Sequence, residues 1–454
     1  MLVVPKLRLG KFVKQVKKKV PWIEHLIEDE SIAGELNPEL IAFKVSRRSL
    51  CVICKGSKLL CGKPRCPILE KFYTFTKIAK GLDTTDLDGD SPPSVFVGRF
   101  GYPHVMIGPM VPPVEGDTSI FDLPEAWFGK SIEEILDYRI KLVRGTFLAN
   151  VKKIHNLENN KLLLRTQELA MSENPVDSEL LLKKKPKQKL LVDSYVQPMG
   201  PSAPLNDFQI DNVKIPKPVQ KVYDDYDLRA NEAILTLYKK EIPVTKIQRI
   251  LSVGVLGVKF DRKLVPTRWS ITAVDSILSK TLREKIKQYP LISKYMVFEV
   301  NYLDNKFVIL MMPRAWSYEL IEAWFPGSTW NPDGTMIGMV GDWEGYKGRK
   351  TYASIGGCYY AARLAVTEYL QKIRRQASII IFRETYPSSL MPLGVWFVRE
   401  CVRAALRRQP FQFDTLEEAL KFVSSGLKIP LRNWLEISGV LQNIRSQRLI
   451  TEFI

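Results

Sequence analysis

Long apolar runs are missing from this 454-residue sequence, and their absence excludes several classes of protein. No uncharged apolar stretch approaches the roughly 20 residues that a helix needs to span a bilayer. The first ten residues contain two cations and no apolar core, which argues against a secretory signal. The sequence also has no evident basic amphipathic helix with an aromatic face, which would indicate binding to a membrane surface. We therefore expect a soluble cytoplasmic protein, associated with the nucleoid and without a membrane partner.

Several catalytic signatures are missing as well. The chain has no G-x-x-x-x-G-K-[ST] loop, which would hold nucleotide phosphates, so the sequence disfavours an ATP-driven motor. Its three histidines, His25, His104 and His155, do not have the spacing of metal ligands. No internal repeat is found. These absences direct attention to charge and to short binding motifs.

Positive charge dominates the sequence, with a formal net charge of +18. Residues 1–80 contain 17 Lys/Arg against 7 Asp/Glu. The densest block, KFVKQVKKK at residues 11–19, includes Lys14, Lys17, Lys18 and Lys19. Such a surface attracts nucleic acid, because neutralising phosphates releases condensed counterions. The arm predicts a contact with DNA, and a basic surface that only maintains solubility is the alternative.

The chain is long enough for two or three domains, and its 45% apolar and 26% charged residues are typical of globular proteins. We divide it into a basic arm, a four-cysteine segment, an amino-terminal lobe, a proline-rich basic crossover, a carboxy-terminal α+β lobe and a tail. These segments are residues 1–46, 47–70, 71–182, 183–222, 223–440 and 441–454. Six prolines in the crossover predict an extended connection between the two lobes.

Strands and helices are expected to follow one another without regular alternation, which indicates an α+β fold. Two β-like runs, Met296–Val300 and Phe307–Met311, bracket a turn at Asp304–Asn305 and predict a hairpin. The pair Ser131 and Glu134 has the spacing of a helix capping box. Apolar residues at helical spacing predict helices over Ser131–Val143, Ala230–Lys239, Ser270–Gln288, Cys358–Arg374 and Gly394–Leu406.

Four cysteines, Cys51, Cys54, Cys61 and Cys66, have the pattern C-x2-C-x6-C-x4-C. A C-x2-C turn brings two thiolates to one side of a loop, and a second pair can complete a tetrahedron around Zn²⁺. We therefore predict a structural zinc site. An iron–sulfur cluster is the weaker alternative, favoured by Pro67 after the last cysteine, and disulfides or free thiols also remain open.

The last eight residues, QRLITEFI, are similar to the peptide by which replication and repair proteins bind a sliding clamp, Q-x-x-[aliphatic]-x-x-[aromatic]-[aromatic]. Gln447, Ile450 and Phe453 match this pattern, and Ile454 replaces the second aromatic residue. One turn of 3₁₀ helix puts the three apolar side chains on one side, where a single pocket can take them. The alternative is a terminal helix that covers the protein's own core.

Five segments together resemble the archaeal Nre DNA repair proteins over most of the chain. They are Cys51–Pro67, Val95–Pro109, Gly356–Leu370, Pro392–Glu400 and the terminal peptide. The resemblance implies a role in repair of DNA damage, a link to nucleotide-excision repair proteins and binding to the archaeal sliding clamp PCNA. It implies no particular enzymatic activity. Ile454 is a departure from the family's clamp peptide, and it puts the strength of that contact in doubt.

Polar, glycine-rich segments suggest weak catalytic candidates, namely Arg99, Arg268, Asp342 and Glu344. Carboxylates near a lysine can bind Mg²⁺ for phosphodiester cleavage. The carboxylate-x-Lys of many nucleases is missing, however, because two residues separate Glu344 from Lys347. A clamp-tethered enzyme, either a metal-dependent nuclease or one that acts on a nucleotide-derived ligand, is therefore the alternative to a binding factor. Side chains held in ordinary salt bridges would explain the same residues.

Overall fold

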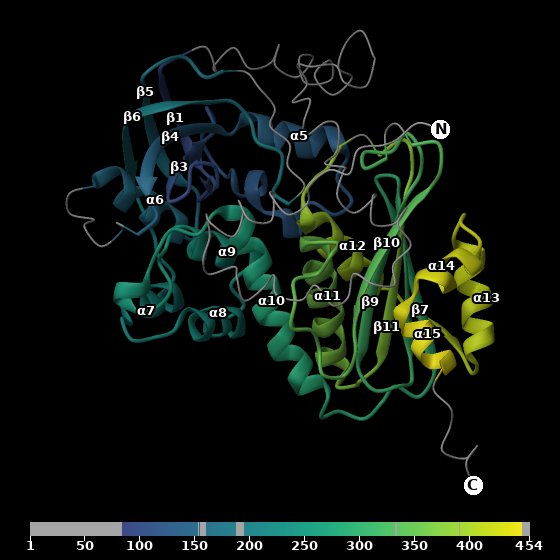
Figure 1. Cartoon of the computed structure of the whole chain (residues 1–454). Coiled ribbons are helices and arrows are strands. Elements are labelled where there is room, and N and C mark those ends of the chain that lie inside the picture. The colour runs from purple at the N-terminus through teal and green to yellow at the C-terminus, as the bar shows by residue number, and fades with distance from the viewer. Residues whose placement is uncertain are drawn as a thin grey trace, which may run out of the picture.

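The computed structural model describes residues 84–446 apart from 153, 155–159, 188–194, 332–333 and 390. It contains two six-stranded sheets with helices around and between them (Figure 1). The predicted α+β class is therefore confirmed. No helix among these residues is both long enough and apolar enough to cross a membrane.

The first sheet has the strand order β1-β5-β6-β4-β3-β2. All neighbouring strands are antiparallel except β4 and β6, which pair in parallel. The β2–β3 hairpin therefore lies at one edge of this sheet and β1 at the other. The bounds are β1 Asp86–Ser91, β2 Val95–Val97, β3 His104–Val111, β4 Val143–Asn150, β5 Val176–Leu182 and β6 Ser202–Asp211. The associated helices are α5 Ile132–Lys141 and α6 Lys161–Met171.

The second sheet has the order β10-β9-β11-β8-β7-β12. β7 and β8 form the predicted hairpin, but its turn is at Leu303–Asp304, where both residues have positive φ angles. Asn305 instead begins β8, so the predicted turn is one residue late. The bounds are β7 Tyr295–Tyr302, β8 Asn305–Met312, β9 Ser317–Trp324, β10 Gly338–Glu344, β11 Ser378–Thr385 and β12 Phe411–Phe413.

Helices cover both faces of the second sheet (Figure 1). Helices α11 (Gly357–Ile373) and α12 (Val395–Leu406) lie on one face, and α13 (Leu416–Gly426), α14 (Leu431–Ile437) and α15 (Gly439–Ser446) on the other. Alternate residues of β8 therefore enter different cores. Phe307, Ile309 and Met311 join the first core, and Val308, Leu310 and Met312 join the second. This explains the uninterrupted apolar run of β8, because a strand buried on both faces needs no polar alternation.

Four helices connect the sheets: α7 Lys217–Asp224, α8 Ala230–Lys239, α9 Val244–Ser252 and α10 Thr267–Ile286. Helix α10 packs against α9 on one side and α11 on the other. One continuous core runs from the first sheet through these helices into the second sheet. This shared core fixes the relative position of the two sheets.

The predicted helices are present. α8 has the predicted bounds, and both hydrogen bonds of the Ser131–Glu134 capping box are formed. α10 begins earlier than predicted, at Thr267 directly after Pro266, a residue that suits a helix start. Within residues 183–222, for which we predicted an extended connection, the structure has the extended strand β6 and the start of α7. The four-cysteine segment lies outside the described residues.

Candidate nucleic-acid interface

The connection between β2 and β3 carries an exposed aromatic side chain beside an arginine. Phe100 is 79% exposed, and the Arg99 guanidinium carbon lies 4.9 Å from the centre of its ring. Gly101 has φ +84°, a conformation that favours glycine. A ring so exposed contributes little to folding and is free to stack on a planar ligand. The predicted candidate Arg99 therefore lies at the tip of a hairpin.

This hairpin packs against the first turn of α10. The backbone N–H of Val97 donates a hydrogen bond to Thr267 Oγ1 at 2.9 Å. The Tyr102 and Trp269 rings are 5.6 Å apart. Arg268 lies between these two α10 residues in the sequence, so the Arg99 and Arg268 segments, far apart in the chain, are neighbours in the fold.

Arg268 is stacked on Tyr195, with its guanidinium carbon 3.6 Å from the ring centre. Tyr195 in turn packs against the start of α11. A Cβ added to Gly356 would lie 2.2 Å from the Tyr195 hydroxyl, so only glycine fits there. The Tyr195 and Tyr352 hydroxyls are 3.5 Å apart. Tyr195 therefore links the α10 arginine to the loop before α11.

Asp342, on β10, organises that loop. Its carboxylate forms an ion pair with Arg349 at 3.0 Å and accepts a hydrogen bond from the Ser354 backbone N–H. Arg349 also donates to the Tyr352 carbonyl, which fixes the position of Tyr352. The Arg99, Arg268 and Asp342 segments are thus connected. We call Arg99, Phe100, Trp269, Arg268, Tyr195 and Tyr352 the arginine–aromatic row.

Glu344 is not part of this surface, because it is buried in the core. Its oxygens lie 3.1 Å from Arg283 and 2.6 Å from Arg363. The Trp316 indole N–H also donates to this carboxylate. Both oxygens are therefore occupied by structural partners, and the sequence proximity of Asp342 and Glu344 does not correspond to a shared metal site in this structure.

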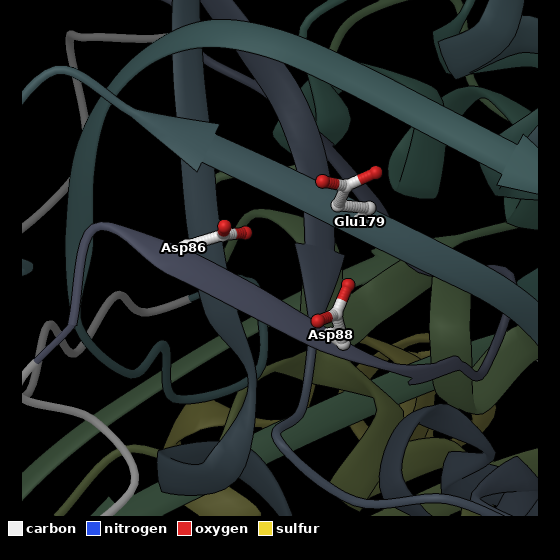
Figure 2. Close-up of side chains that lie close together, drawn as sticks. All are labelled: Asp86, Asp88 and Glu179. Carbon is white, nitrogen blue, oxygen red and sulfur yellow. The ribbon is translucent and has the colours of Figure 1, made fainter.

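Three carboxylates gather elsewhere, at the β1 edge of the first sheet (Figure 2). Asp88 on β1 is directly opposite Glu179 on β5, and Asp86 lies on the same face. One carboxylate oxygen from each of the three residues lies within 4.8 Å of those of the other two. Partial burial and the charges of Asp86 and Asp88 raise the pKa of Glu179. We assign no metal site to this exposed cluster, but it gives this edge a charge opposite to that of the hairpin edge.

Sequence reasoning missed all four rings of the row, Phe100, Trp269, Tyr195 and Tyr352, and it missed Arg349. The available signal was the Gly356–Gly357 pair, because two adjacent glycines before a helix allow another chain segment to approach closely. The remaining site predictions lie outside the described residues. They are Cys51, Cys54, Cys61, Cys66, Lys14, Lys17, Lys18, Lys19, Gln447, Ile450, Phe453 and Ile454.

The fold and the row define an α+β protein with arginines and stackable rings on a surface that joins its two sheets, a composition shared with surfaces that bind nucleic acid. Residues 60–331 match the family model described as "Archaeal Nre, N-terminal", and residues 344–453 match "Archaeal Nre, C-terminal". The chain belongs to the archaeal Nre family.

Curated relatives match over most of their lengths. One, named DNA repair protein NreB from Archaeoglobus fulgidus, is 44% identical over 89% of this chain and 100% of its own. DNA repair protein NreA from the same organism is 42% identical over 85% of this chain and 95% of its own. DNA repair protein NreA from Haloferax volcanii is 35% identical over 80% and 89%.

No solved structure matches this chain. The two family models meet between residues 331 and 344, which is inside the second sheet. β7, β8 and β9 come from the first matched region. β10 lies between the two regions and ends at Glu344, where the second region begins. The second sheet is therefore built from both regions, and neither region contains a complete sheet-and-helix unit of that half of the fold.

Proposed function

We propose that this protein acts in DNA repair, binding DNA across the arginine–aromatic row and the sliding clamp PCNA through residues 447–454. The names of its relatives support the repair role. The row is the observation that supports the DNA contact, because it brings guanidiniums and rings from distant segments together. Nucleotide-excision repair proteins are the further partners that we propose from the family.

The chemistry of the row suits a nucleic acid. Guanidinium groups present a planar fork of donors that matches phosphate, and exposed rings stack on bases. Arg268 also lies in the first turn of the 20-residue helix α10, where the positive end of the helix dipole favours an anion. The basic arm at residues 1–46 would add phosphate contacts that do not depend on base sequence.

Replacing Arg268 with Ala is expected to weaken DNA binding on the order of 10-fold, as for loss of a charge-assisted phosphate contact. On duplex DNA, the slope of log K against log salt should decrease by about 1. Phe100→Ser should weaken binding to DNA that contains unpaired bases and leave Tm unchanged, because the ring is exposed. Fluorescence anisotropy across a salt series measures both effects.

Arg229→Ala provides the matched control, because Arg229 is an exposed arginine before α8. It should reduce affinity far less than Arg268→Ala. Equal effects of the two substitutions, or wild-type protein that does not bind DNA, would contradict the proposed DNA contact.

We also propose that Cys51, Cys54, Cys61 and Cys66 hold a structural Zn²⁺. The donor set supports this, since four thiolates suit a closed tetrahedral zinc site with no open position. Cys61→Ser should reduce bound zinc from about one ion per chain to nearly none, since a three-thiolate site binds the metal weakly. Elemental analysis measures this change. Iron with visible charge-transfer absorption, or no metal in the wild type, would reject it.

A further inference from the structure

Arg144, on β4, lacks, within the described residues, the acidic partner that an enclosed arginine normally has. Its guanidinium carbon lies 5.0 Å from the centre of the Phe96 ring, and Nη1 is 3.5 Å from the Met199 sulfur. Its Nε is buried and has no hydrogen-bond acceptor in the described part of the chain. Among the residues that the structure describes, no Asp or Glu pairs with it. Burial lowers the pKa of Arg144 to about 10, which still leaves it charged at neutral pH.

Neighbouring groups do not compensate this charge. Arg139 and Arg249 share the single carboxylate of Asp122, at 2.6 and 2.7 Å. These three residues line a cavity of about 30 Å³ that Phe96 and Met199 also line. The carboxylate of this cavity is therefore already occupied by two arginines other than Arg144.

A charge enclosed without a partner is unfavourable for folding, and replacing such a group with an apolar one often stabilises a protein. An arginine in this situation is well placed for an anionic ligand that completes its hydrogen bonds. Arg144 is partly exposed, so such a ligand can reach it. It also contacts the same small cluster, through Phe96 and Met199, that Tyr195 of the arginine–aromatic row packs against.

We propose that Arg144 binds a backbone phosphate of an unpaired DNA strand. This inference rests on the proposed DNA contact and specifies which form of DNA the surface accepts. The cavity that Phe96 lines has room for only two or three water molecules, at roughly 10–15 Å³ each, so a base does not enter the protein there.

The sheet beside Arg144 favours a single strand over a duplex. Leu148 is four residues after Arg144 on β4 and therefore lies on the same face of the strand. Its side chain is 62% exposed, and its cross-strand partner Met106 is 43% exposed. Leu148 and Met106 thus form an exposed apolar pair on the face of the sheet that also carries Arg144. Flexible strands with unstacked bases can cover such a pair, whereas a duplex presents its phosphates on a rigid outer surface.

The test measures binding of a fluorescein-labelled oligothymidylate to wild-type protein and to Arg144→Gln. The variant is expected to bind 10- to 100-fold more weakly, with a salt slope lower by about 0.7, the contribution of one phosphate on a single strand. Its Tm should not fall, because no carboxylate among the described residues pairs with the lost charge. Arg144→Lys should keep the salt slope but bind several-fold more weakly, since it lacks the guanidinium fork.

Arg165→Gln is the matched control, because Arg165 is on α6 and is paired with Asp207. It should bind the oligonucleotide as the wild type does. Unchanged affinity of Arg144→Gln, with DNA binding otherwise intact, overturns this inference and leaves the proposed function standing. Wild-type protein that binds only the matching duplex, or that is stabilised by inorganic phosphate or thymidine monophosphate but binds no oligonucleotide, overturns it too. Absence of all DNA binding overturns both.

Discussion

Deletion of residues 447–454 is expected to abolish binding to PCNA and to leave Tm almost unchanged. The helix before this peptide, α15, is attached to the second sheet by residues that the deletion retains. Val440 and Leu441 are buried in the core below it. The Glu319 carboxylate accepts hydrogen bonds from the Gly439 and Val440 backbone N–H groups. The folded body therefore keeps its own contacts when the peptide is removed.

Single substitutions in the peptide should weaken PCNA binding to different extents. Burial of a Phe or Ile side chain is worth roughly 1.5–3 kcal/mol, so Phe453→Ala should weaken PCNA binding about 10- to 100-fold. Ile450→Ala should have nearly the same effect. Gln447→Ala should have less, because its hydrogen bonds replace bonds to water. Titration calorimetry of the peptide and its variants with PCNA measures these differences.

The alternative, in which the terminal segment covers the protein's own core, predicts the opposite results. Deletion would then lower the free energy of unfolding by several kcal/mol, as for other losses of buried apolar contacts. A synthetic 447–454 peptide would also fail to bind PCNA. Thermal denaturation of the truncated protein, measured beside peptide calorimetry, distinguishes the two cases.

Glu344→Gln is expected to lower the free energy of unfolding by about 3–5 kcal/mol, because it removes the carboxylate shared by two buried arginines. Arg363 would keep a charge inside the core without its carboxylate partner, and Arg283 would keep only its ion pair with the more exposed Glu284. The amide keeps the shape of the side chain, so the loss reports charge and not a cavity. Guanidinium denaturation measures it from the transition midpoint, with the m-value as a check on the unfolded state.

Asp414→Asn is a suitable control for this substitution. Asp414 forms an ion pair with Lys294, but the aspartate side chain is 78% exposed. Solvent-exposed pairs contribute roughly 0–1 kcal/mol, so the control should be nearly neutral. If Glu344→Gln proved equally mild, the interpretation of Glu344 as the centre of a structural ion-pair network would be wrong.

Features that depend on neighbours in the chain were predictable from the sequence. The ends of α8, the capping box of α5 and the β7–β8 hairpin follow from periodicity and from side chains that bond within one turn. The turn of that hairpin was misplaced by one residue, since Leu303 and Asp304 adopt positive φ and Asn305 begins the strand. Local sequence therefore predicts that a turn forms, but it predicts the exact position of the turn less well.

The sequence by itself determined the α+β class, most helices and the family, and it predicted the binding motifs near both ends of the chain. Tertiary structure alone decided which polar residues meet. Arg268 stacks on Tyr195 and not on a residue of its own helix, and Glu344 pairs with Arg283 across 61 positions. The physical reason is the separation in the sequence between the groups that interact. Helix caps and turns are closed by atoms a few residues apart, whereas the arginine–aromatic row exists only because one continuous core holds distant segments together.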